Sequence, residues 1–115
     1  MRFEEKTVGD VVVLTVTGEV SLTGEGDVHL RDKVANLLND GRLRLVLDLA
    51  GVTYIDSAGL GQLVHVQTSA NAAGASLKLA GPSARFRHLL TVAKIASLFD
   101  IHDDNESALA SFAVP

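Results

Sequence analysis

Cysteine is absent from this chain of 115 residues, so neither a disulfide nor a thiolate metal site can form. Tryptophan is also absent and aromatic residues are only 4% of the sequence, so the core must consist mainly of Leu, Val, Ala and Ile. No run of Lys or Arg occurs and the net charge is −4, which argues against a nucleic-acid partner. The longest apolar run, Val11–Leu14, is far too short to span a membrane, and Met1–Asp10 lacks the apolar core of a signal peptide. These absences predict a soluble, cytoplasmic protein, and the length suits one domain over residues 1–115.

The other elements are organised around Leu43–Val64, where a strand pattern leads into a helix pattern. Leucines alternate with other residues over Leu43–Leu49, which predicts a strand that presents four leucines on one face. A connector is expected over Ala50–Ile55. Helical spacing of apolar residues then predicts a helix over Ser57–Ala73, with Gly74 as its stop.

Two polar residues stand where this helix begins. Asp56 and Ser57 are both good N-cap types. Gly59 and Gly61 follow in the first turns, and each glycine costs helix stability, up to about 1 kcal/mol against alanine in an interior. Two glycines beside one serine keep the surface around its hydroxyl open, so we interpret Ser57 as a residue that another protein reaches.

The remaining elements are an initial hairpin followed by strands that alternate with helices. They are an edge strand guarded by charges (Arg2–Val8), a turn (Gly9-Asp10), a strand ended by Gly18 (Val11–Thr17), a loop (Val20–Gly26), a helix (Asp27–Asp40) followed by Gly41 at its C′ position, a strand (Ser76–Ala80), a third helix capped by Ser83, a last strand (Leu98–His102), and a fourth helix with Asp103 and Glu106 at capping-box spacing. This order implies an α/β fold with a mixed sheet of four to five strands and about four helices in a single domain.

Several of these segments together resemble a known family. They are Gly18-Glu19-Val20, Leu43–Val64, Leu77–Pro82 and Leu98–Leu109. The chain resembles over nearly its whole length the STAS domain, which sulfate transporters and anti-sigma factor antagonists share. The most specific part is the Asp-Ser-Ala-Gly-Leu-Gly segment after the leucine-rich strand. In the antagonists, a Ser or Thr at this place is phosphorylated by a partner kinase, often the anti-sigma factor itself, and a metal-dependent Ser/Thr phosphatase reverses the reaction.

The resemblance implies a role for each residue of that segment. Ser57 would be the phosphoacceptor and Asp56 its acidic neighbour, while Gly59, Leu60 and Gly61 would line the docking surface. The unphosphorylated protein would bind the anti-sigma factor and so free the sigma factor. The partners implied are therefore an anti-sigma factor that is a serine kinase, and a Ser/Thr phosphatase. We expect no nucleic-acid or membrane partner, and a monomer or weak dimer.

The loop after the hairpin and the end of the third helix depart from the family pattern. Ser21 stands where the family often has an Asp close to the phosphosite; with Thr23, we include it in the partner-binding set. Ala93-Lys94-Ile95 replaces a common Thr-Gly-Leu, and Lys94 adopts a left-handed C-cap conformation less cheaply than glycine does.

A phosphate on Ser57 is also reasonable on physical grounds. It would carry about −1.5 to −2 charges. At a helix N-terminus it would meet free N–H groups and the positive end of the dipole, a gain of roughly 0.3–1 kcal/mol. A complex that buried the same charge without a partner would lose about 3–5 kcal/mol. The expected mechanism is obstruction by charge without a change of fold.

Structural interpretations of the same residues stay open at this point. Ser57 and Asp56 can each serve only as a helix cap. Gly59 and Gly61 can serve close helix packing instead of partner approach.

Other charged side chains are more typical of a solvated surface than of a site. Asp48 lies in a strand and is interpreted as a surface or sheet-edge charge. Arg85, Arg87 and His88 form a small basic face on the third helix, which either is solvated or holds a phosphate or an acidic partner.

Enzyme chemistry has no support in the sequence. The four histidines lack metal-ligand spacing, the surroundings of Ser57 lack the first glycine of a nucleophile elbow, and no phosphate-binding loop of the Walker type occurs. We therefore expect no catalytic residue, no metal and no cofactor. The alternative to a switch is a non-switching STAS subunit of a lipid transporter, or a scaffold protein of a stress-signalling complex.

Overall fold

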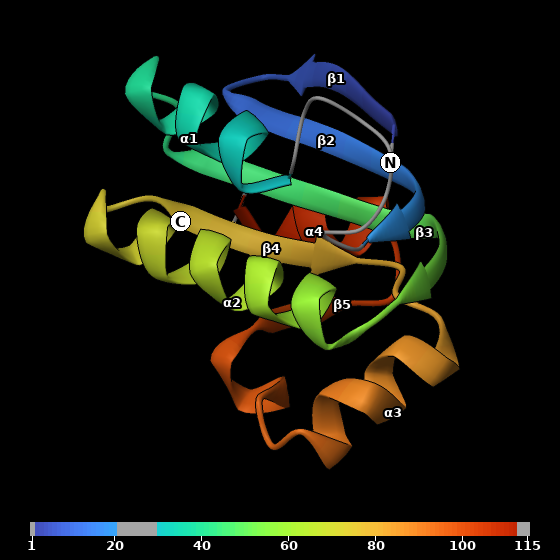
Figure 1. The fold of residues 1–115 in the computed structure, drawn as a ribbon. Helices are drawn as coiled ribbons and strands as arrows, with labels where there is room; N and C mark the ends of the chain where they lie inside the picture. Colours follow the sequence, from blue (N-terminus) through green and yellow to red (C-terminus); the bar gives the residue numbers. More distant parts are fainter. Residues whose placement is uncertain (1, 21–29, 113–115) are drawn as a thin grey trace.

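A computed structural model of the chain describes residues 2–20 and 30–112. These residues form one five-stranded sheet in the order β1-β2-β3-β4-β5 (Figure 1). The first pair of strands is antiparallel and the others are parallel. The elements are β1 (Arg2–Val8), β2 (Val11–Val20), α1 (Leu30–Asn39), β3 (Arg44–Ile55), α2 (Ser57–Ala72), β4 (Ser76–Ala80), α3 (Ala84–Val92), the 3₁₀ turn η1 (Ala96–Leu98), β5 (Asp100–His102) and α4 (Asn105–Phe112). The predicted α/β class with a mixed sheet is confirmed.

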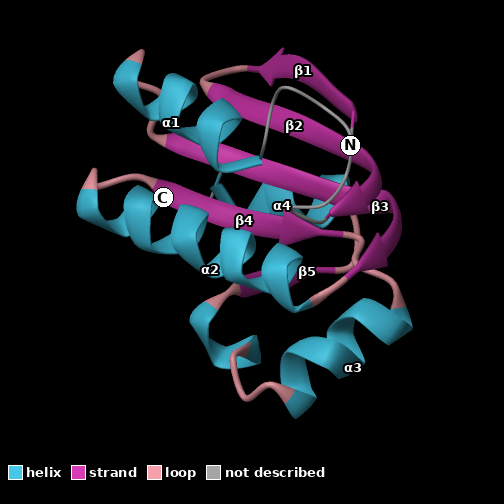
Figure 2. Cartoon of the chain, viewed as in Figure 1, coloured by secondary structure: helices cyan, strands magenta, loops and turns pink. Residues whose placement is uncertain are grey.

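Helices cover both faces of the sheet, as Figure 2 shows. Alternate residues of β2 and β3 point to opposite faces because the side-chain period of a strand is two. On one face, Leu14 and Leu47 belong to the large core that also includes apolar residues of α1, α2 and α3. On the other face, Val13 and Val46 pack with Ala108 of α4. The helices α1, α2 and α3 therefore share one face, and α4 covers the opposite one.

The face of leucines predicted on the central strand is only partly correct. Leu45, Leu47 and Leu49 are buried in the large core. Leu43 lies before the first residue of β3 and is 51% exposed. Three leucines, not four, thus anchor the strand.

The expected connector over Ala50–Ile55 is wrong, because β3 continues to Ile55. The β-branched and aromatic residues of this stretch suit a strand, and they pair with the second half of β2. The expectation that Gly18 ends β2 is also wrong. Gly18 has φ +90°, and the register shifts between it and Glu19, so this glycine forms an irregularity after which β2 continues to Val20.

The first three helices end in the same way. Gly41 and Gly74 take up the left-handed conformation with φ +80° and +74°, and Lys94 does so with φ +62°. In each case the next residue donates its backbone N–H to a carbonyl five residues earlier, as in a Schellman motif. The third helix thus ends at the same kind of C′ position without the glycine. The predicted start of the first helix, Asp27, lies outside the described residues.

Two details of the C-terminal part differ from expectation. The last strand contains only Asp100–His102, because Leu98 belongs to η1 and is half exposed. Asp104, not Asp103, accepts a hydrogen bond from the Ser107 N–H at the start of α4 (2.8 Å). That backbone hydrogen bond lowers the pKa of the Asp104 carboxyl from its usual value.

Asp48 has a structural role that its interpretation as a surface or sheet-edge charge did not include. It lies in the central strand β3 and is only partly exposed. Its carboxylate accepts hydrogen bonds from the Asn105 amide (2.9 Å), the Thr15 hydroxyl (3.4 Å) and the Ala50 backbone N–H (3.1 Å). This side chain therefore ties the start of α4 to the sheet.

Candidate functional site

The start of α2 carries the predicted serine in an accessible position. Asp56 is the N-cap residue, with an extended backbone (φ −114°, ψ −175°), and its carboxylate accepts a hydrogen bond from the Gly59 N–H at 2.8 Å. Ser57 is the first residue of the helix and is exposed. The capping role therefore belongs to Asp56, and it leaves the Ser57 hydroxyl for another use.

The two glycines of this turn have different roles. A Cβ added to Gly59 would overlap the carbonyl oxygen of Val20 and lie 2.9 Å from Cγ1 of Ile55. A Cβ added to Gly61 would meet no atom of the described residues within 4 Å. Gly59 is thus required for close packing of α2 against the end of β2, whereas Gly61 has open space around it within the described part of the chain.

Ser57 and Gly61 lie four residues apart, so they share one face of α2. Both are exposed, and so is His65 one turn further along. Leu60 is only partly buried and packs against the large core. As far as the described residues show, the hydroxyl therefore stands at the end of an exposed helix face, with a partly accessible leucine beside it.

The electrostatics of this position favour added negative charge. The first N–H groups of a helix have no partner within the helix, and the macrodipole places partial positive charge there. Asp56 engages the N–H of Gly59 at this end. A second negative group at Ser57 would share the same field with that carboxylate.

Ser21 and Thr23, the remaining residues predicted for partner binding, lie outside the described residues. The structure therefore brings together Asp56, Ser57, Gly59, Leu60 and Gly61 in one helical turn and its cap.

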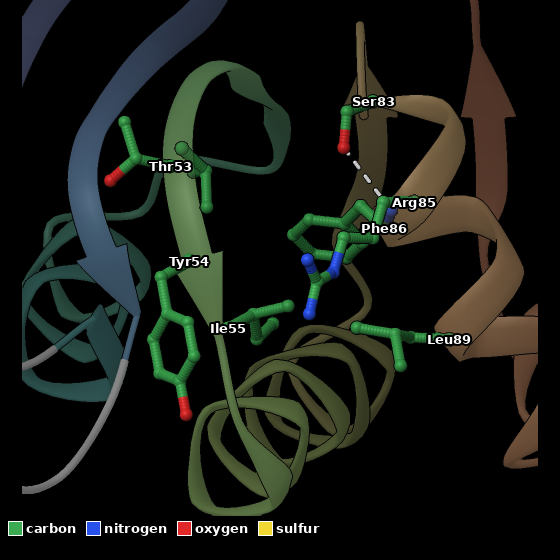
Figure 3. A pocket seen from close by; sticks show the side chains of 8 residues that line it. Thr53, Tyr54, Ile55, Ser83, Arg85, Phe86 and Leu89 are labelled. Carbon is green, nitrogen blue, oxygen red and sulfur yellow. Dashed lines mark hydrogen bonds between the residues drawn. The ribbon is translucent and has the colours of Figure 1, made fainter.

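The predicted basic face of α3 does not act as one unit. Arg87 forms an ion pair with Asp103 at 2.8 Å. His88 is exposed on the surface. Arg85 instead borders a cavity of about 60 Å³ between the end of β3 and α3. Figure 3 shows this cavity, with the Ser83 hydroxyl accepting the hydrogen bond of the Phe86 N–H at its rim (3.1 Å).

This cavity was not predicted from the sequence, because Ala50–Ile55 was expected to be a connector and not the end of β3. The run Val52-Thr53-Tyr54-Ile55 was the available signal, since β-branched and aromatic residues are typical of a strand. Once that stretch is a strand, only part of its side chains face the third helix: in Figure 3, Ile55 points toward α3, whereas Thr53 and Tyr54 point away from it.

Metal binding and membrane insertion find no support in the described part of the chain. No group of three or more His, Asp or Glu residues there could hold a metal ion. None of the described helices is long and apolar enough to cross a membrane.

Known proteins share both the sequence pattern and the fold of this chain. The family model described as "Mlab, STAS domain" matches residues 3–100. A homolog of TM1081 from Thermotoga neapolitana, whose name gives it as a candidate anti-sigma factor antagonist, is 30% identical over 109 residues, with 93% of this chain and 94% of that protein covered. The anti-sigma-B factor antagonist of Bacillus subtilis (strain 168) is 33% identical over 95 residues, with 79% and 86% covered.

A solved structure with low sequence identity has the same fold. SpoIIAA of Bacillus in its phosphorylated form superposes with a TM-score of 0.72 at 18% identity, covering 96% of this chain and 99% of that one. Its unphosphorylated form superposes with a TM-score of 0.70 at the same identity, with 97% of each chain covered. At this level of identity the likeness concerns the fold alone.

Proposed function

Because the chain belongs to the STAS domain family of anti-sigma factor antagonists, we propose that it binds an anti-sigma factor through the start of α2 and that a phosphate on Ser57 abolishes this binding. The bound anti-sigma factor is itself the serine kinase, and a Ser/Thr phosphatase restores the active form. The observation that carries the proposal is the exposed hydroxyl of Ser57 at the first position of α2, with the capping role held by Asp56. SpoIIAA, a neighbour in fold, is described in an unphosphorylated and a phosphorylated form.

The isolated domain tolerates the phosphate. A group of about −1.5 to −2 charges meets the positive end of the helix dipole, which contributes roughly 0.3–1 kcal/mol. The cap need not change, because the Asp56 carboxylate already engages the N–H of Gly59. The side chain of Ser57 is exposed, so the added group stays in water.

A complex does not tolerate it. A partner that covers the open face beside Gly61 removes the phosphate from water. An unpaired buried charge costs about 3–5 kcal/mol. Since every 1.4 kcal/mol changes an equilibrium constant tenfold, affinity falls by about a hundredfold or more.

The test begins with the site of modification. The purified protein is incubated with the cognate serine kinase and ATP, and the phosphate is mapped by mass spectrometry. We expect one phosphate on Ser57, none in the Ser57→Ala variant, and a nearly unchanged circular dichroism spectrum. A phosphate on another residue would refute the assignment, and so would co-purification of an unphosphorylated chain with a transporter.

A matched pair of substitutions then separates local charge from charge in general. Ser57→Glu should weaken binding of the anti-sigma factor at least tenfold. Ser97→Glu places the same charge on the exposed η1 turn and should leave binding unchanged. Equal effects of the two variants would contradict a local obstruction.

The open face is tested through Gly61. No described atom lies within 4 Å of a Cβ at this position, so a leucine fits there without disturbing the fold. We expect Gly61→Leu to retain the circular dichroism spectrum and melting temperature within a few degrees, yet to weaken partner binding by about tenfold or more through steric overlap. Unchanged affinity would show that the partner does not use this face.

A further inference from the structure

The C-terminal half of β3 has a strand neighbour on one side only. β3 pairs with β4 as far as Asp48 and Ala80. Beyond that point, Gly51–Ile55 continues to pair with β2. No other described strand lies on the opposite edge of this stretch, so that edge presents backbone groups without a sheet partner.

The cavity beside α3 runs along this free edge. Its floor and walls include Val52 and Ile55 of β3 and Phe86 and Leu89 of α3. A volume of about 60 Å³ is the size of one short aliphatic side chain, and it is well below the roughly 150 Å³ of an apolar cavity that accepts benzene.

A free positive charge stands at the mouth of the cavity. In Figure 3 the Arg85 side chain reaches from α3 across the cavity toward Ile55. Arg85 is exposed, and none of the ion pairs among the described residues includes it. Arg87, two residues further, is by contrast engaged by the Asp103 carboxylate. The guanidinium of Arg85 is therefore available to an external carboxylate, which it can bind in the bidentate geometry.

We propose that the free edge of β3 and this cavity bind an extended peptide segment of a partner protein, with an aliphatic side chain two residues from a carboxylate. The peptide backbone pairs with Val52–Tyr54 as an added strand. The aliphatic side chain fills the cavity, and the Asp or Glu two residues away pairs with Arg85. In an extended peptide, side chains two apart share one face and adjacent ones point to opposite faces; because Arg85 borders the same cavity, the two contacts come from positions two apart.

This site is distinct from the proposed phosphoacceptor. It uses β3 and α3, whereas the proposed switch uses the exposed face of α2. Binding at the cavity requires neither a kinase nor a phosphate on Ser57, so either proposal can fail while the other stands.

The probe is the acetylated and amidated heptapeptide Thr-Val-Thr-Asp-Thr-Val-Thr, in which Val and Asp are two residues apart and share one face. It is titrated into the isotopically labelled protein and followed by amide and arginine side-chain NMR signals. We expect saturable shifts at Val52, Thr53, Tyr54 and Arg85, together with slower hydrogen exchange of the amides on the free edge of β3. The same peptide with Lys in place of Asp should bind at least about tenfold more weakly, because its charge repels the guanidinium.

Substitutions on α3 identify the charge that matters. Arg85→Gln should weaken binding of the Asp-Val peptide by about tenfold or more. Arg87→Gln removes a cation that is already paired with Asp103, so it should leave the affinity for the peptide unchanged. No shift at millimolar peptide, or equal loss in both variants, would overturn the proposal. Isovalerate alone binding as tightly as the peptide would also overturn it, because strand pairing would then contribute nothing.

Discussion

Replacing Gly59 by alanine is the sharpest test of how the phosphoacceptor turn is held. The new methyl group would overlap the carbonyl oxygen of Val20 and lie 2.8 Å from its carbonyl carbon. Two of the three nearest atoms belong to the backbone of β2, so no rotamer change can relieve the overlap. Overpacking of this kind typically costs about 1–3 kcal/mol, and we expect the upper end because the backbone itself must shift. For a domain of this length the melting temperature should fall by about 10 °C.

Gly61→Ala is the matched control two residues away in the same helix. Its methyl group meets no atom of residues 2–20 and 30–112 within 4 Å. Only helix propensity then changes, so stability should rise by up to about 1 kcal/mol, which raises the melting temperature by up to roughly 4 °C. Both variants are compared by thermal and urea unfolding followed by circular dichroism. If Gly59→Ala is as stable as Gly61→Ala, the close packing of α2 against β2 is incorrect.

Three further predictions concern the rest of the fold. Lys94→Gly should stabilise the protein by about 1 kcal/mol in urea unfolding, because φ +62° strains a residue with a Cβ; a loss of stability would contradict the left-handed C′ position. Asp48→Ala should destabilise the protein by about 1–3 kcal/mol, since the carboxylate accepts hydrogen bonds from Asn105 and Thr15. An unchanged midpoint of urea unfolding would exclude a role of Asp48 in anchoring α4. The lowered pKa of Asp104 means that its carboxylate stabilises the fold above the unfolded value of 3.8, and that this contribution disappears as the pH falls through the lower folded value. The Asp104→Ala variant should therefore be less stable than the unchanged protein at neutral pH, and its stability should fall less when the pH is lowered. Melting curves recorded at several pH values measure both effects.

Much of the fold follows from local sequence patterns. The period of two placed Leu45 and Leu47 correctly on the buried face of the central strand. The glycines after the first two helices marked their ends, because both adopt positive φ. The third helix ends similarly at Lys94, with the Ile95 N–H donating to the Leu90 carbonyl, although lysine is not a residue that marks a left-handed position in a sequence.

The errors arose where the environment of a strand decides its length. Gly18 looked like a stop, but β2 passes it through a local irregularity because β3 supplies partners beyond it. Ala50–Ile55 was expected to be a connector, yet the same pairing makes it a strand. Asp104 and not Asp103 accepts the hydrogen bond at the start of α4. Asp103 instead pairs with Arg87, which is 16 residues earlier, and local spacing could not show this pairing.

The sequence predicted where the candidate residues lie in the fold, while their roles in partner binding and phosphorylation stay predictions. Asp56 and Ser57 do lie at the start of a helix, as predicted. The structure shows that Asp56 is the N-cap residue. The sequence could not separate Gly59 from Gly61, because the difference depends on how close the backbone of Val20 approaches. That approach is a property of the packed fold.

Calorimetric titration of one anti-sigma factor against two forms of this protein tests the central claim most directly. The two forms are the unmodified chain and the chain phosphorylated at Ser57, with matched circular dichroism spectra. We predict that phosphate raises the dissociation constant by about a hundredfold or more, since it adds charge to an exposed helix start that the partner must cover. Equal dissociation constants for the two forms would contradict the account.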